Sequence, residues 1–134
     1  MTRTRASARK AGSAFESLVV AFLAEHVDDR IERRARNGSK DRGDVSGLRH
    51  MGGRVVVECK NTARLDLAGW LAEAEVERGN DDAVAAMVVH KRHGKASAAE
   101  QLVTLRLVDL VALLTGERPE LCNALHSSSS EVDR

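Results

Sequence analysis

The sequence predicts a single α/β domain in which helices flank a mixed β-sheet. Three observations support this fold class. The chain has 134 residues, close to the commonest size of one domain, and 43% of them are hydrophobic, which is enough for one core without disulfide bonds. Segments with helical spacing of apolar residues alternate with β-forming runs in the order α-β-β-β-α-β, followed by a further strand and helix. The sequence shows neither an internal repeat nor an interdomain linker.

Both ends of the chain differ from the rest in composition. We expect residues 1–11, which are small and basic, to form a flexible arm. Residues 119–134, which include the run HSSSS, are expected to form a disordered tail. The folded domain then covers residues 12–118. The arm carries no acid and four basic residues, namely Arg3, Arg5, Arg9 and Lys10.

The first helix is predicted from Ser13 to about Val27. Its apolar residues have the spacing of a helix with one buried face, and they are Phe15, Leu18, Val19, Phe22 and Leu23. Ser13 is a candidate N-cap, and Glu16, three residues later, would complete a capping box.

A three-stranded meander is predicted next. Residues 31–36 form a short charged edge strand, and the following NGSKDRGD has the composition of a turn. A second short strand is expected over residues 45–48. The sequence HMGG then forms a hairpin turn into residues 54–60, RVVVECK, the strongest strand signal in the chain.

The C-terminal half supplies two further helices and two further strands. The second helix begins after Asp66 and ends near Gly79, with Trp70 on its buried stripe. The strands are expected over residues 83–90 and 101–106. The last helix, LVDLVALLTG, ends at Gly116.

The strand over residues 54–60 carries an unusual polar pair. Because strand side chains alternate, Glu58 and Lys60 lie on the same face. Such a pair is often a weak ion pair at the solvated end of a strand. However, Asp44 begins the strand that should pair with this one, so the hairpin would bring Asp44 beside Glu58 and Lys60.

Two neighbouring carboxylates repel each other unless they share a proton or a cation. An all-oxygen site with Asp44 and Glu58 suits Mg²⁺, for which Mn²⁺ could substitute. The main-chain carbonyl of Cys59 would be a third ligand while its thiol packs in the core. Lys60 would orient the attacking water or hold the charge that develops on a phosphate. This arrangement predicts metal-assisted hydrolysis of a phosphodiester.

The motif GDVSG followed by VVVECK, in the predicted order of elements, resembles the PD-(D/E)xK nuclease superfamily, and in particular the small Holliday-junction resolvases of archaea and phages. The likeness covers about residues 13–114. It implies a restriction-endonuclease-like core, metal ligands Asp44 and Glu58, and Lys60 as the catalytic lysine. It also implies that the first helix presents Glu16 to the site, so Glu16 is either a catalytic acid or a helix cap. Gly43 departs from the family pattern, which has Pro there.

Basic clusters, with compensating acids elsewhere in the chain, predict one face that contacts a polyanion. A solvated tail and solvated turns would explain the same clusters equally well. The candidate DNA-binding residues are Arg3, Arg5, Arg9, Lys10, Arg36, Ser39, Lys40, Arg42, Lys91 and Arg92.

The predicted function is a Mg²⁺-dependent, structure-selective DNA endonuclease that makes paired symmetric nicks in a four-way junction. The family likeness implies products with 5′-phosphate and 3′-hydroxyl ends. Two symmetric cuts require a homodimer with paired sites. Two alternatives remain: another nuclease of this superfamily, for repair nicking or restriction, and a non-catalytic DNA-binding module on the same fold.

The remaining features limit the environment in which the protein acts. The chain has no apolar run of membrane-spanning length and no hydrophobic signal segment, so no membrane partner is expected. Cys59 and Cys122 show neither metal nor redox spacing and are interpreted as reduced thiols of a cytoplasmic protein. No organic cofactor is expected.

Overall fold

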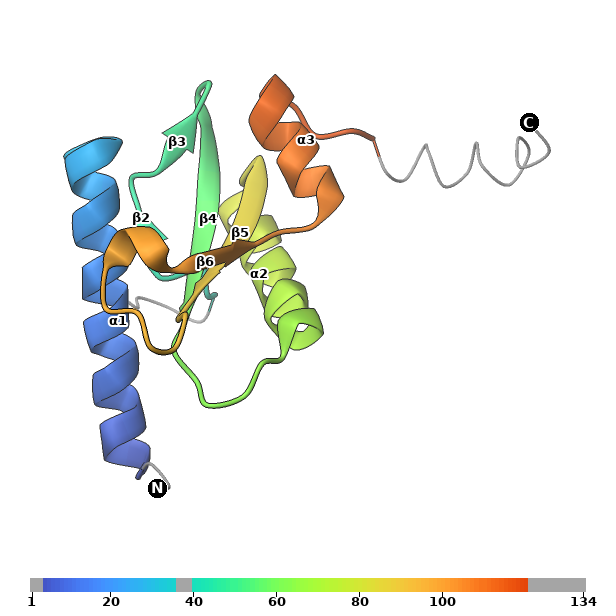
Figure 1. Cartoon of the computed structure of the whole chain (residues 1–134). Helices are drawn as coiled ribbons and strands as arrows, with labels where there is room; N and C mark the ends of the chain where they lie inside the picture. Colours follow the sequence, from blue (N-terminus) through green and yellow to red (C-terminus); the bar gives the residue numbers. More distant parts are fainter. Residues whose placement is uncertain (1–3, 36–39, 121–134) are drawn as a thin grey trace.

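The computed structural model describes residues 4–35 and 40–120. Within these ranges it contains a mixed four-stranded sheet, a two-stranded sheet and three α-helices (Figure 1). The elements in chain order are α1 (Arg5–His26), β1 (Glu32–Arg33), β2 (Val45–Ser46), β3 (Arg49–His50), β4 (Gly53–Lys60), α2 (Leu67–Asp81), β5 (Ala85–His90), the 3₁₀ turn η1 (Ala98–Glu100), β6 (Leu102–Thr104) and α3 (Leu107–Thr115).

The four-stranded sheet has the order β3-β4-β5-β6. Strand β4 pairs antiparallel with β3 and parallel with β5, and β6 pairs antiparallel with β5. The parallel pair needs a crossover connection, which α2 provides. Strands β1 and β2 form the separate two-stranded sheet. The predicted α/β class with a mixed sheet is therefore confirmed.

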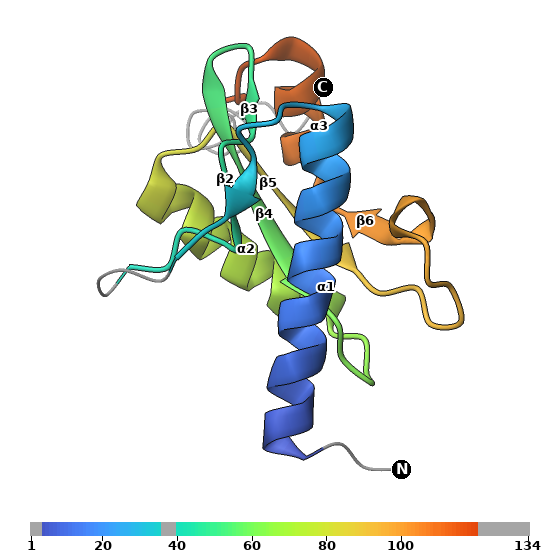
Figure 2. The ribbon, with the colours of Figure 1, turned by 90° about the vertical axis from the view of Figure 1, so that its left-hand side faces the viewer.

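Helices α1 and α2 cover opposite faces of β4, with α1 nearest the viewer in Figure 2. The alternation of strand side chains explains this layering. Val57 and Cys59 point to one face and join a core cluster with Phe15 of α1. Val56 points to the other face and packs with Trp70 of α2. Glu58 and Lys60 share the parity of Val56, so they lie on the α2 side.

The prediction of a flexible arm over residues 1–11 is wrong for the part that the structure describes. Helix α1 begins at Arg5 and is capped by Thr4, whose side chain accepts a hydrogen bond from the backbone of Ser7. Ser13 is therefore not the N-cap, and Glu16 is not part of a capping box. The segment is rich in Ala and Arg, which are strong helix formers, so it continues the helix without apolar periodicity.

The predicted strand over residues 45–48 is divided in two by Gly47. Its φ of +88° disfavours other residues, and a Cβ there would lie 2.7 Å from the carbonyl oxygen of Arg30. As a result β2 pairs with β1, whereas β3 forms the predicted hairpin with β4. Met51 and Gly52 turn this hairpin with φ values of 51° and 85°.

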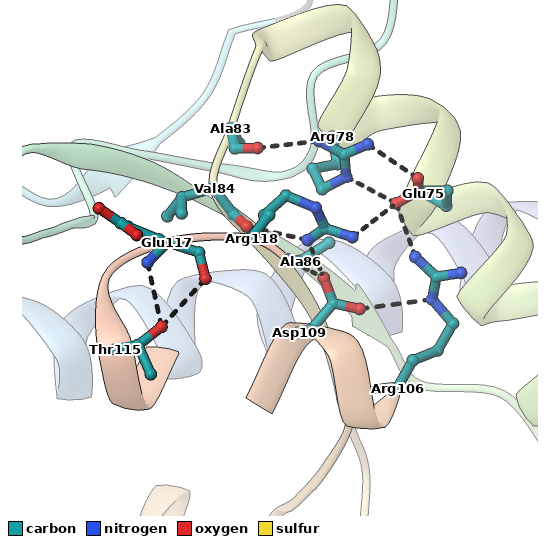
Figure 3. Close-up of polar contacts among 10 residues, drawn as sticks. All are labelled: Glu75, Arg78, Ala83, Val84, Ala86, Arg106, Asp109, Thr115, Glu117 and Arg118. Atoms are coloured by element: carbon teal, nitrogen blue, oxygen red, sulfur yellow. Dashed lines mark hydrogen bonds and ion pairs between the residues drawn. The ribbon is translucent and has the colours of Figure 1, made fainter. Parts of the chain in front are cut away.

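Helix α3 is fixed to the domain by a network of charged side chains around Asp109 (Figure 3). Asp109 is 2% exposed and accepts hydrogen bonds from Arg118, at 2.7 Å, and from the backbone of Ala86 in β5. Arg106 lies 3.4 Å from Asp109 and 3.0 Å from Glu75 of α2. Through these contacts α3 is held to both β5 and α2.

Candidate metal centre

Four acidic side chains converge between β4 and α2. One carboxylate oxygen from each can be chosen so that all four lie within 4.8 Å of one another. Glu58 comes from β4, Asp41 from the loop that precedes β2, and both Glu73 and Glu77 from α2. Such a group of oxygens could hold a metal ion. We call these four residues the acidic cluster.

Glu58 is the buried member contributed by the strand. Its side chain is 3% exposed, although the residue lies near the end of β4. Burial strongly raises the pKa of Glu58, and the neighbouring side chains of Asp44 and Glu77 raise it further. A carboxylate in this position needs either a proton or a cation to balance its charge.

Glu77 is the buried member contributed by the helix, and it is 1% exposed. Neither of its carboxylate oxygens accepts a hydrogen bond from a donor that the structure describes, because the side chains of Glu58 and Asp41, which face it, are themselves acids. Burial raises the pKa of Glu77 to about 7; Glu58 opposes the shift, and Asp41 and Glu73 support it. Two buried acids that face each other without a basic partner fit either a shared proton or a divalent cation between them.

Asp44 lies beside this cluster, as the hairpin geometry predicted. Its Oδ2 accepts a hydrogen bond from the backbone N–H of Cys59 at 2.8 Å, and its own N–H donates to the carbonyl of Val57 at 3.0 Å. These bonds fix Asp44 at the end of β4. The N–H of Cys59 therefore points from β4 toward Asp44. The thiol of Cys59 is buried in the core next to α1, and burial strongly raises its pKa.

Lys60 contacts Glu73, one of the exposed members of the cluster. Its Nζ donates to both oxygens of Glu73, at 3.2 and 3.0 Å. Burial works to lower the pKa of Lys60, but the bond to Glu73 and the charges of Glu58 and Asp44 outweigh it, so the pKa is raised. Lys60 is thus a fully charged ammonium at the edge of the centre.

Glu16, the fourth predicted catalytic residue, lies elsewhere. It projects from α1, and its Oε1 accepts a hydrogen bond from Arg33 Nη2 at 3.0 Å. It is not a member of the acidic cluster, because α1 packs on the face of β4 opposite to that of Glu58. The alternative role, a capping box, is excluded by the start of α1 at Arg5.

The predicted DNA-binding residues are distributed over several surfaces. Arg5, Arg9 and Lys10 are exposed on the first turns of α1, and Lys40 and Arg42 are exposed in the loop before β2. Beyond β5, Arg92 pairs with Glu100 at 2.8 Å and Lys91 donates to backbone carbonyls of the same turn. Three further candidates, Arg3, Arg36 and Ser39, lie outside the described residues.

Asp41, Glu73 and Glu77 were not predicted from the sequence as members of the site. A signal for two of them was present, because residues four apart lie on the same face of a helix and Glu77 follows Trp70 and Ala74 on the buried stripe. An acid on a buried stripe indicates a polar partner or a site. Asp41 had no comparable signal, because its position depends on the path of the loop.

Searches of protein-family models, curated proteins and solved structures gave no match to this chain. In the part of the chain that the structure describes, no helix combines the length and the apolar composition needed to cross a membrane.

Proposed function

We propose that the protein is a Mg²⁺-dependent endonuclease that cuts branched DNA, with a four-way junction as its substrate. The observation that carries this proposal is the pair of buried acids, Glu58 and Glu77, which lie together beside Asp44 and the charged Lys60, with no basic side chain among the described residues bonded to Glu77. This set of groups suits a hard cation and a phosphate.

The ligands in the proposal are Asp44, Glu58 and the carbonyl of Cys59, joined by the unpartnered oxygens of Glu77. All of them are oxygen donors, which favours Mg²⁺ and allows Mn²⁺. When bound, the ion would supply a Lewis acid for the phosphate and lower the pKa of a coordinated water.

The chain itself would contribute positioning and charge. Lys60 holds a positive charge next to the acids and would hydrogen-bond to a phosphate oxygen as negative charge develops there. Glu73 binds Lys60 through both oxygens and thereby fixes the direction of the ammonium group. Glu73 would therefore act as a positioning residue.

The choice of DNA as substrate is supported by the resemblance to the PD-(D/E)xK superfamily and by the exposed basic residues near the centre. A helix, an antiparallel hairpin, a crossover helix and a parallel strand follow one another in the expected order. Resolution of a junction by two symmetric cuts requires two copies of the centre, so we propose a homodimer.

Cleavage assays test the proposal. The protein, with and without Mg²⁺, is incubated with labelled four-way junction, linear duplex and single strand. We expect paired nicks in the junction that require the metal. Asp44→Asn keeps an acceptor for the N–H of Cys59 but loses the charge, and Lys60→Ala loses the ammonium; both variants should lose at least about 100-fold in rate, in line with the loss of one group that stabilises transition-state charge.

Folding and junction binding of both variants serve as controls and should be retained. Equal cutting of linear duplex would instead favour another nuclease of the superfamily. A folded protein that binds DNA but cuts no substrate with Mg²⁺ or Mn²⁺ would refute the enzyme and leave a DNA-binding module.

A further inference from the structure

An open groove of about 390 Å³ lies beside the acidic cluster. Its lining is polar and contains four arginines against two aspartates, which gives a local excess of positive charge. The lining residues that bear on its chemistry are Arg34, Arg42, Arg49, Arg54, Asn80 and Asp81. We call it the arginine groove.

Two of the arginines form a fixed floor. Asp81 is 6% exposed, and its side chain lies 3.5 Å from Arg34 Nη2 and 3.6 Å from Arg54 Nε. Arg54 also donates through Nε and Nη2 to the backbone carbonyl of Asp81, at 2.9 and 2.7 Å. The Nε of Arg34 is buried and has no hydrogen-bond partner among the described residues. Two arginines share the one carboxylate of Asp81, so this floor has a net positive charge and its side chains are held in place.

The other two arginines, Arg42 and Arg49, are exposed at the rim of the groove. Among the described residues, Arg49 makes one long side-chain contact, 3.4 Å from its Nη1 to the carbonyl of Gly52. Guanidinium groups match the geometry of phosphate oxygens and bind them through two parallel hydrogen bonds. An open polar groove suits a chain of phosphates, because sites for small molecules are mostly apolar and enclosed.

The groove and the acidic cluster are connected through two elements. Arg42 follows Asp41 of the cluster directly, and Asn80 of the groove donates to the backbone carbonyl of Asp41 at 2.8 Å. On α2, Glu77 of the cluster and Asp81 of the groove are one turn apart, which is about 6 Å along the helix axis. Consecutive phosphates of a DNA strand are spaced about 3.4 Å along the duplex axis, so the two sites are within about two nucleotides of each other.

We infer that the arginine groove binds the phosphate backbone of the DNA next to the phosphate that is cut. This inference rests on the proposed function and adds to it a location for the flanking strand. Of the four arginines, Arg49 and Arg54 were not expected from the sequence to contact DNA. Since these contacts would be made to phosphates, they should contribute affinity without base specificity.

Binding measurements in EDTA test the inference separately from cleavage. The affinity of the full-length protein for labelled four-way junction and linear duplex is measured by fluorescence anisotropy over a range of salt concentrations. Arg42→Ala and Arg49→Ala each remove one rim charge, and each should weaken binding and reduce the slope of log K against log salt by about one. The matched control is Lys95→Ala, an exposed charge outside the groove, which should leave the slope unchanged.

The outcomes distinguish this inference from the proposed function. Slopes of the Arg42 and Arg49 variants equal to that of Lys95→Ala would overturn the groove even if the wild-type protein cuts junctions. If Arg42→Ala and Arg49→Ala reduced the salt slope but the wild-type protein cut no DNA, the results would support DNA binding by the groove and refute the nuclease. If the wild-type protein bound neither the four-way junction nor the linear duplex, the inference that the groove binds DNA would be overturned. Thermal unfolding of each variant confirms that it is folded.

Discussion

At the scale of single residues, the structure explains the departure from the resolvase-like motif at Gly43. This residue has a φ of +96°, and its N–H donates to Asp41 Oδ1 at 3.0 Å. Proline fixes φ near −65° and has no N–H, so it could satisfy neither condition. A Cβ at this position would also lie 2.9 Å from Val56 Cγ1. Glycine here turns the loop so that Asp41 reaches the acidic cluster and Asp44 reaches the end of β4.

The raised pKa of Glu77 makes stability depend on pH when no metal is bound. Because the pKa is about 7 in the folded protein and 4.5 ordinarily, the stability provided by protonated Glu77 is complete below pH 4.5 and is lost as the pH rises towards 7. Glu77→Gln should remove this loss and stabilise the protein at pH 8 by on the order of 2 kcal/mol.

Thermal unfolding in EDTA from pH 4 to pH 8 measures this effect. The matched control is Glu25→Gln, because Glu25 is exposed on α1. If the Glu77 and Glu25 variants showed the same pH dependence as the wild-type protein, the buried carboxylate would not be the source of the effect. Added Mg²⁺ should stabilise the wild-type protein at pH 8 more than Glu77→Gln, because the ion binds the folded state.

At the scale of elements, the sequence predicted helices with strong apolar periodicity better than features that depend on packing between elements. Helix α2 was predicted with its N-cap Asp66, and α3 with its end at Gly116, because caps and apolar spacing are local signals. The extension of α1 to Arg5 was missed because its first turns are exposed and carry no apolar stripe. The division of β2 from β3 was missed because it depends on close packing of Gly47 against Arg30.

The network around Asp109 should make α3 sensitive to one substitution. Asp109→Ala would leave the N–H of Ala86 without its acceptor and Arg118, of which 18% of the side chain is exposed, without its closest carboxylate. We expect a loss of about 2–3 kcal/mol in the free energy of unfolding.

Urea unfolding measures this loss. Glu100→Ala is the control, because it breaks an ion pair with Arg92 whose side chains are 47% and 50% exposed, and it should change stability by less than about 0.5 kcal/mol. Equal effects of the two substitutions would show that the network does not hold α3 in place.

At the scale of the whole molecule, the predicted neighbours of Asp44 agree with the structure. Asp44 lies beside Cys59 and Glu58, as expected, although it precedes β2 and is held there by its hydrogen bonds to Val57 and Cys59 of β4. Glu16 was assigned to the centre through a family resemblance, and the packing of α1 places it on the opposite face. Glu73 and Glu77 join the centre because the crossover helix α2 packs over β4. A motif confined to the strands carries no information about this packing.

The N-terminal turns of α1 extend beyond the sheet (Figure 2). They carry the exposed basic residues Arg5, Arg9 and Lys10. If they contact DNA, replacing Arg5, Arg9 and Lys10 together by Ala should weaken junction binding and reduce its salt slope by about three. Since Ala is the strongest helix former, the melting temperature should not fall.

Anisotropy titrations with four-way junction measure the slope, and circular dichroism measures the helix content. A triple variant that retained the wild-type slope would show that α1 does not touch DNA. Replacement by Ala is preferable to deletion of residues 1–11, because deletion would remove the N-cap Thr4 and the first turns of α1.

The acidic cluster draws its oxygens from a loop, a strand and a crossover helix, and no single stretch of the chain contains them all. An isolated peptide from any of the three could not reproduce the centre. Because only the folded domain brings these oxygens together, an ion bound there would lose its site when the crossover helix separated from the sheet. Calorimetry would then record its departure and the melting of the domain as one cooperative event.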